Sequence, residues 1–404
     1  MRRVVITGAG TVNALGHSVG QTYAALAAGR GAIGALDILE ADRLASPIGA
    51  QVRGWQPSAQ FSARELAMLD PFAQFALASA RQAMVQAGLD LVPQIASAVA
   101  QRAGVVLGTA GGGLTTTNDA YRAVYSQGKN RVAPLTVPRL MASAAASHIS
   151  MALGLMGPSF AVSSACASSN HAMGLAVQML RAGAADIMLA GGSEAMLSFG
   201  GLKAWEALRV MSPDGCRPFC ATRNGMVQGE GGAVFVFEDM DHARARGAPV
   251  LAEVLGFAMT SDAADLVMPS QTGAERAMAG ALADAGLGIG DVDYINAHGT
   301  GTAANDRVET AAIRTVFGAQ ANRLAVSSTK SMHGHLIGGA GAVELLACLM
   351  ALQDGVIAPT IGYTAPDTEC DLDIVPNTAR RAAVRVAMSN AFAFGGMNAS
   401  IILG

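Results

Sequence analysis

Long apolar runs, charge and cysteine are all scarce in this 404-residue sequence, and each scarcity excludes a class of protein. No apolar run is long enough to span a bilayer, and the opening "MRRVVITGAG" has an apolar stretch too short for a signal peptide. Charged residues make up only 14% of the chain and the net charge is −3, which gives no basic surface for nucleic acid. Five cysteines in a chain of this length do not make a disulfide framework, so we expect reduced thiols and a cytoplasmic location.

Glycine and apolar residues are abundant instead, with 48 glycines and 51% hydrophobic residues. Short apolar runs such as "GVVLGT" and "DIMLAGG" end in glycine-rich turns and precede helical patterns. This alternation is typical of α/β proteins with buried, largely parallel sheets. The length indicates two domains or one duplicated unit.

Internal similarity favours duplication. The segment "AVSSACASSNHAMG", starting at residue 161, resembles "AVSSTKSMHGHLIG", starting at residue 325. Strand-like and glycine-rich segments flank both in the same order. Chance similarity among turns rich in alanine, glycine and serine is the alternative, but it does not explain the shared order. We therefore predict two similar α/β halves, 1–248 and 249–404, joined near residues 245–252.

Cys166 is the first candidate for chemistry. Apolar residues recur at helical spacing between 173 and 180, and Gly183 is a plausible helix end, so Cys166 should lie near a helix N-terminus. There the helix dipole and free N–H groups favour a nucleophilic thiolate. The alternative is a buried, inert thiol, the usual state of a free cysteine. That alternative is preferred for Cys348, and no pattern singles out the remaining cysteines: Cys216, Cys220, Cys370.

Two histidines and a lysine occupy matching places in the second half. His298 follows an apolar strand in "INAHGTGT", and His335 stands at the start of a glycine-rich helix, five residues after Lys330. Strand ends aim side chains into a crevice, where a catalytic base belongs. A single histidine is more often a core or cap residue, but two of them and a cysteine in equivalent places favour a shared site. His333 and His335 are one residue apart without an acidic partner, so we predict no metal site.

Asp306 and Glu309 lie in the first turns of the predicted helix "NDRVETAAIRTVFG". Acidic residues are favourable near a helix N-terminus, and this is their expected main role. Glu309 is additionally expected near the site.

Several motifs together resemble the β-ketoacyl-[acyl-carrier-protein] synthases of the KAS I/II type, within the thiolase superfamily. They are "GPSFAVSSACASSNHA", "ADIMLAGGSEAM", "INAHGTGT", "VSSTKSMHGHLIGGAGAVE" and "SNAFAFGGMN", and the resemblance covers essentially the whole chain. It implies a duplicated five-layer αβαβα fold and a decarboxylating Claisen condensation that needs no cofactor. It also implies acyl carrier protein (ACP) as partner, a homodimer, and neither membrane nor nucleic acid as ligand.

The resemblance also assigns roles. Cys166 would carry the acyl group, while His298 and His335 would stabilise the enolate formed from the malonyl thioester. Lys330 would support the histidines, and the N–H groups of Cys166 and Phe394 would form the oxyanion hole. The other expected site residues are Phe392 (with Phe394 in the gating loop), Thr300, Thr302, Asp306 and Glu309 (substrate and turn positions) and Arg209 (carrier contact). Relatives sometimes hold a structural cation near residues matching Asn296, Glu344, Ser389 and Asn390.

Departures from the family pattern bear on the substrate. Gly111 and Thr136 stand where relatives often carry bulky residues of the acyl pocket, so we expect long, bulky or polyene acyl chains. Ala393 replaces a glycine of the gating loop, and His333 replaces a threonine. A thiolase would carry a second catalytic cysteine in the "AFGGMN" loop, and a non-catalytic chain-length factor would lack Cys166. The active subunit of a heterodimer with such a factor stays open as an alternative.

Overall fold

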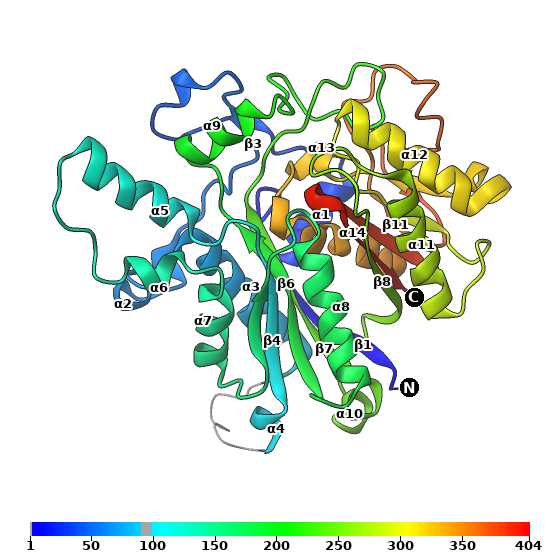
Figure 1. Ribbon diagram of the computed structural model, residues 1–404. Helices are drawn as coiled ribbons and strands as arrows, with labels where there is room; N and C mark the ends of the chain where they lie inside the picture. Colours follow the sequence, from blue (N-terminus) through cyan, green and yellow to red (C-terminus); the bar gives the residue numbers. More distant parts are fainter. Residues whose placement is uncertain (1, 90–97) are drawn as a thin grey trace.

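A computed structural model describes residues 2–89 and 98–404, and a ten-stranded mixed sheet runs through it (Figure 1). The order of the strands is β10-β9-β13-β14-β8-β1-β7-β6-β4-β5. Their bounds are β1 (Val4–Asn13), β4 (Ala103–Gly108), β5 (Ser159–Val162), β6 (Ile187–Glu194), β7 (Gly231–Asp239), β8 (Ala252–Ser261), β9 (Tyr294–Asn296), β10 (Ala325–Ser327), β13 (Ala387–Ala393) and β14 (Met397–Leu403).

The strand order repeats itself. If the five strands of each half are numbered along the chain, their order across the sheet is 1-5-4-2-3. This order holds for β1-β7-β6-β4-β5 in the first half and for β8-β14-β13-β9-β10 in the second. The halves meet where β1 and β8 pair antiparallel. Four pairs of strands are parallel and five antiparallel, so the prediction of largely parallel sheets is wrong. The last strand of each half runs antiparallel to its neighbours; β13 and β14 form a hairpin across the tight turn 394–396.

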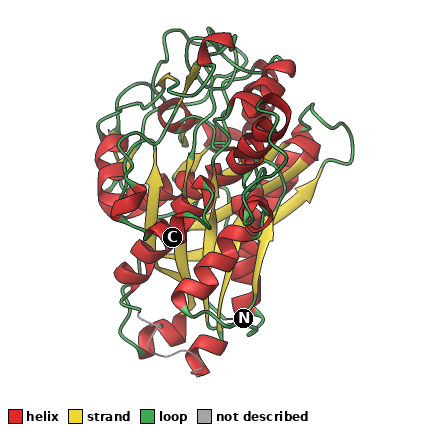
Figure 2. Cartoon of the chain, turned by 90° about the vertical axis from the view of Figure 1, so that its left-hand side faces the viewer, coloured by secondary structure: helices red, strands yellow, loops and turns green. Residues whose placement is uncertain are grey.

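Helices complete five layers (Figures 1 and 2). Helices α8 (Ser168–Arg181) and α14 (Ala340–Asp354) lie at the centre and pack against strands of both halves. On the outer faces, α3 (Pro71–Ala87) and α7 (Ala144–Leu153) cover the first half, while α11 (Gln271–Ala285) and α12 (Ala303–Phe317) cover the second. This confirms the predicted αβαβα arrangement.

The remaining elements surround this body. Helices α5 (Leu114–Tyr121) and α6 (Thr136–Leu140) form an arm that projects on the left of Figure 1, and α9 (Phe199–Ala207) lies above it. The short elements are α1 (Val19–Ala27), α2 (Ala63–Leu66), α4 (Ala98–Gln101), α10 (Met240–Ala245), α13 (Lys330–His333), β2 (Gly34–Ala35), β3 (Ile48–Gly49), β11 (Val356–Ile357) and β12 (Arg380–Arg381).

One segment corrects the expectation about apolar runs. Ile337–Asp354, which includes α14, is 18 residues long with a mean hydropathy of 1.3, enough by length and composition to cross a bilayer. However, 83% of it is buried inside the protein. A helix that is apolar on all sides suits this central layer, where protein surrounds it.

Candidate active site

Cys166 lies at the junction of β5 and α8, in the first half. As predicted, a helix begins just after it, at Ser168, and Gly183 follows the helix with φ of 74°. Ala165 adopts φ of 49°, a left-handed conformation that is costly for a residue with a side chain. A Cβ at Gly108 would lie 2.3 Å from the backbone of Ser168, so glycine there lets α8 start against β4. These features hold the cysteine, which is 6% exposed, at a fixed point.

The Cys166 thiol is protonated in the resting protein. Burial raises its pKa to about 12, and this outweighs the charge of Lys330 and the N–H groups of Phe394 and Cys166, which lower the pKa. The expectation that the helix end favours a thiolate is therefore wrong for the resting state, because desolvation is the larger effect. The two N–H groups nevertheless face the sulfur, as expected for an oxyanion hole.

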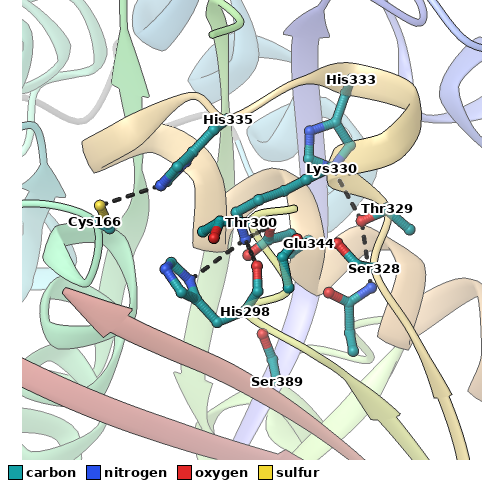
Figure 3. Close-up of polar contacts among 12 residues, drawn as sticks. Cys166, His298, Thr300, Ser328, Thr329, Lys330, His333, His335, Glu344 and Ser389 are labelled. Carbon is teal, nitrogen blue, oxygen red and sulfur yellow. Dashed lines mark hydrogen bonds and ion pairs between the residues drawn. The ribbon is translucent and has the colours of Figure 1, made fainter. Parts of the chain in front are cut away.

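His298 and His335 reach the sulfur from the second half (Figure 3). His298 follows β9 by two residues, whereas His335 lies in a turn between α13 and the 3₁₀ turn Ile337–Gly339, not within a helix. His335 Nε2 is 3.1 Å from Cys166 Sγ, and the imidazole centroids are 5.4 Å apart. One nitrogen of each imidazole and the sulfur lie within 4.8 Å of one another. The fold thus brings together three side chains that are distant in sequence.

Hydrogen bonds fix the tautomers of both imidazoles. The Ile337 N–H donates to His335 Nδ1 at 3.1 Å, so the proton of this neutral ring lies on Nε2. The Lys330 ammonium, which can only donate, faces His298 Nδ1 at 3.5 Å, so His298 also carries its proton on Nε2. Burial, then the charge of Lys330, lowers the pKa of each histidine well below its usual value. Two neutral N–H donors therefore serve one pocket.

This donor set fits an oxyanion better than a metal ion. A metal bound to Cys166, His298 and His335 would need the lone pairs of the Nε2 atoms, but these atoms carry the protons. It would also lie beside the Lys330 ammonium.

Lys330 is buried completely, and three acceptors surround its ammonium group. They are His298 Nδ1, the His298 carbonyl oxygen at 2.5 Å and the carboxylate of Glu344, with which it forms a buried ion pair. Each ammonium hydrogen has a partner, so the charge is held beneath the pocket and not in it.

Buried oxygen atoms bear on the structural cation that the resemblance implies. Asn296 Oδ1, Glu344 Oε2 and Ser389 Oγ have no hydrogen-bond partner among the described residues. Ser389 pairs with Asn296 in the register of β13 and β9. Such oxygens suit a hard cation. Asn390 differs, because its side-chain oxygen accepts a hydrogen bond from Ser400.

Asp306 and Glu309 hold the loop that follows His298. Glu309 accepts the backbone N–H groups of His298 and Gly299 at 2.8 and 2.7 Å, while Asp306 accepts that of Gly301 at 3.2 Å. Both carboxylates are fully buried and turned towards this loop, so a dipole effect on their own helix is not their main role. Thr302 caps α12 instead.

A pocket gives access to the three side chains, which form part of its wall. Its lining includes the remaining predicted residues of the gating loop and the threonine turn: Phe392, Phe394, Thr300 and Thr302. A wider, open groove lies between α5 and α9. Trp205 lines both spaces and stacks on Phe394, with ring centroids 5.9 Å apart and planes 23° apart. These two rings therefore stand between the groove and Cys166.

Three predicted residues lie outside this group. Gly111 is on the turn after β4, where a Cβ would be 3.3 Å from Met196, a residue that lines the groove. Thr136 begins α6 in the projecting arm and is not among the residues that line either space. Arg209 is exposed, next to Val210 at the pocket.

Sequence reasoning missed several residues of the site. No spacing or charge pattern in the sequence identifies Trp205 and Met196 as residues of the site. Glu344 was expected only as a cation ligand, not as the ion-pair partner of Lys330. Glu194, fully buried at the end of β6, lies in the quoted motif "ADIMLAGGSEAM" but received no role.

Comparisons with known proteins agree with this geometry. The family models "Beta-ketoacyl synthase, N-terminal domain" and "Beta-ketoacyl synthase, C-terminal domain" match residues 1–243 and 251–364. The chain is 50% identical to nodulation protein E of Rhizobium sp. (strain N33), over 98% of each chain. It is 39% identical to 3-oxoacyl-[acyl-carrier-protein] synthase 2 of Coxiella burnetii, over all of this chain and 98% of the relative.

A solved structure, "The ishigamide ketosynthase/chain length factor", superposes with a TM-score of 0.95 at 34% identity, covering 100% of this chain and 99% of the other. The matched domains span most of the sequence, and the fold and the relative from Coxiella burnetii agree with them. The chain belongs to the β-ketoacyl synthase family and is an acyltransferase that forms carbon–carbon bonds.

Proposed function

We propose that the protein is a β-ketoacyl-ACP synthase that condenses an acyl group on Cys166 with malonyl-ACP. The half 1–248 supplies the nucleophile and the half 249–404 supplies His298, His335 and Lys330. The observation that carries the proposal is the convergence of one sulfur and two imidazole N–H donors on a single pocket.

In the first step, the sulfur of Cys166 attacks the thioester of acyl-ACP. The N–H groups of Cys166 and Phe394 stabilise the tetrahedral oxyanion. The carrier thiolate leaves and takes up the proton that the cysteine gave up. Lys330 lowers the cost of forming the cysteine thiolate through its charge.

In the second step, malonyl-ACP loses CO2 and leaves an enolate. The Nε2 protons of His298 and His335 donate to the thioester oxygen, where the negative charge develops. The enolate carbon attacks the acyl carbonyl on Cys166, a carbon–carbon bond forms, and the cysteine leaves as a thiolate that takes up a proton. All these groups belong to the chain, and no cofactor is required.

The acyl chain is proposed to be long, bulky or polyunsaturated. Gly111 lets Met196 lie against the turn after β4, since a Cβ there would be only 3.3 Å from Met196, and Met196 and Trp205 line the groove between α5 and α9. A phenylalanine at 111 would project towards Met196 and shorten this path. The expected result is that Gly111→Phe keeps activity on short acyl-ACPs and loses it on long ones. The same chain-length profile in both proteins would contradict this pocket assignment.

Acyl carrier protein is the proposed partner, with Arg209 at the pocket entrance as its contact. A homodimer is proposed because β5 is an exposed edge of the sheet and the adjoining arm exposes Tyr121, Tyr125 and Val137. Thr136, in the same arm, would reach the acyl channel of the second subunit. A heterodimer with a chain-length factor is the second candidate, favoured by the ketosynthase/chain length factor neighbour. The mass of the purified protein in solution, alone and with co-expressed neighbours, separates the two.

The cytoplasm is the proposed location, because all five cysteines are free and buried in the fold. The function is tested by mixing the protein with a panel of acyl-ACPs and malonyl-ACP. We expect an acyl adduct on Cys166 by intact mass and release of 3-oxoacyl-ACP. Cys166→Ala should show no adduct, whereas His335→Ala should form the adduct but little product. A wild-type protein that gains no adduct would overturn the proposal.

A further inference from the structure

Glu194 is a buried carboxylate to which the mechanism above gives no role. It ends β6, is fully buried and accepts four hydrogen bonds. Three come from one turn after β4: Thr109 Oγ1 at 3.0 Å, the Ala110 N–H at 2.7 Å and the Gly111 N–H at 3.2 Å. The fourth comes from the Gly338 N–H at 3.1 Å, in the other half of the chain.

Gly338 connects this carboxylate to His335. It follows Ile337, whose N–H donates to His335 Nδ1 and so sets the proton on Nε2. The carbonyl oxygen of Gly338 accepts a hydrogen bond from Ser169, in the helix that follows Cys166. A Cβ on Gly338 would lie 2.3 Å from the Ala110 nitrogen, so the two turns are in tight contact. Both backbone groups of Gly338 are therefore hydrogen-bonded, the N–H to Glu194 and the carbonyl to Ser169, and these bonds hold the 335–338 turn in place.

The hydrogen-bond partners of Glu194 indicate that its carboxylate fixes the position of the two turns and does not add to the stability of the fold. All four of its partners are neutral donors, whereas Glu238, another fully buried glutamate, pairs with Arg246. A buried carboxylate without a cationic partner is costly, and only its hydrogen bonds compensate for it. Burial raises the pKa of Glu194 to about 7, while its four neutral donors favour the ionised form, since a protonated carboxyl group must itself donate. An amide could not reproduce this contact set.

We propose that Glu194 is a positioning residue of the condensation, which holds the 335–338 turn so that His335 presents its Nε2 proton to the malonyl thioester. It acts through Gly338 and Ile337 and does not touch the reacting atoms. Because the same carboxylate holds the Thr109–Gly111 turn, it also fixes the acyl-pocket wall relative to His335. The inference rests on the roles proposed above for Cys166 and the histidines.

The test separates the two steps of the reaction. Full-length wild type and Glu194→Gln are first acylated with acyl-ACP, and transfer to Cys166 is followed by intact mass. The acylated proteins are then mixed with malonyl-ACP in a single turnover, and CO2 release is timed. We expect Glu194→Gln to acylate at about the wild-type rate and to release CO2 about 10- to 100-fold more slowly, because misplacement of a catalytic group by ~1 Å costs about that much.

Glu238→Gln is the matched control, because it removes the charge of an equally buried glutamate away from the pocket. It should lower the thermal stability and leave the ratio of the two rates unchanged. Ser169→Ala removes the hydrogen bond to the Gly338 carbonyl and should also slow CO2 release more than acylation, by a smaller factor. This variant tests the inference if Glu194→Gln does not fold. Equal losses in both steps, or no loss in either, would overturn the inference. A wild-type protein that neither acylates nor releases CO2 would instead overturn the proposed function.

Discussion

Replacing Lys330 with methionine tests both the stability and the chemistry of the site. The side chain is fully buried and its ammonium group has three acceptors: His298 Nδ1, the His298 carbonyl and Glu344. Methionine has a similar length but donates nothing, so Glu344 remains buried without a counter-charge. Removing one partner of a buried ion pair costs about 3–5 kcal/mol of unfolding free energy. Loss of the donor at Nδ1 also frees His298 to move its proton away from the pocket, and loss of one oxyanion donor lowers kcat about 10²- to 10³-fold.

A double variant distinguishes these two effects. Lys330→Met with Glu344→Gln replaces the charged pair by a neutral one, so most of the lost stability should return. The condensation rate should stay low, because nothing restores the donor to His298. Urea denaturation reports the stability, and 3-oxoacyl-ACP formation under saturating acyl-ACP reports the rate. If the double variant recovers activity together with stability, Lys330 acts only by supporting the fold and the tautomer argument is refuted.

Four further predictions concern neighbouring groups. Since the pKa of Cys166 is about 12, the rate of its alkylation by iodoacetamide should rise about tenfold per pH unit from pH 7 to 10. The rate is followed by mass spectrometry, and a plateau near pH 8 would contradict the raised pKa. Lys330→Met should slow the labelling at each pH, because the lysine lowers that pKa. Glu309→Ala leaves the N–H groups of His298 and Gly299 without an acceptor and should lower kcat about 10²-fold. Glu309→Gln keeps one acceptor oxygen and should lower kcat less. Equal rates for both variants and wild type would refute the role of Glu309 in holding the loop. Trp205→Ala removes the ring stacked on Phe394 and should shift the acyl-ACP profile towards longer or bulkier chains, so an unchanged profile would argue against a gate at this point.

Much of this architecture follows from local sequence patterns. The repeated segments at 161 and 325 predict two similar halves, and the strand order repeats accordingly. Cys166 and His298 lie close to a helix start and a strand end as expected, whereas His335 lies in a turn and not at the start of a helix. Strand and helix ends can be predicted in this way because apolar periodicity and glycine mark them within about ten residues.

The electrostatic state of the site is less accessible from sequence. Cys166 lies near a helix N-terminus as expected, yet its pKa is raised, because burial outweighs the effect of the helix end. The tautomer of His298 depends on Lys330, 32 residues away, and Glu194 reaches Gly338 across 144 residues. The antiparallel course of the last strand in each half likewise depends on tertiary pairing. No local pattern encodes contacts at such separations.

The arrangement of charge explains why a lysine lies so close to the pocket without entering it. A free cation in the pocket would bind the carboxylate of the malonyl group and stabilise the state before CO2 leaves. Catalysis instead requires interactions that strengthen only as the enolate forms. Glu344 and His298 occupy all the hydrogens of Lys330, so the pocket presents two neutral N–H donors aimed where the enolate oxygen develops. Phe392, whose ring centroid is 6.1 Å from that of His298, adds an apolar wall next to these donors. The Lys330–Glu344 ion pair therefore helps the pocket to stabilise the transition state more than the bound malonyl group. For this reason, replacing it by a neutral pair should restore the stability of the fold but not the condensation rate.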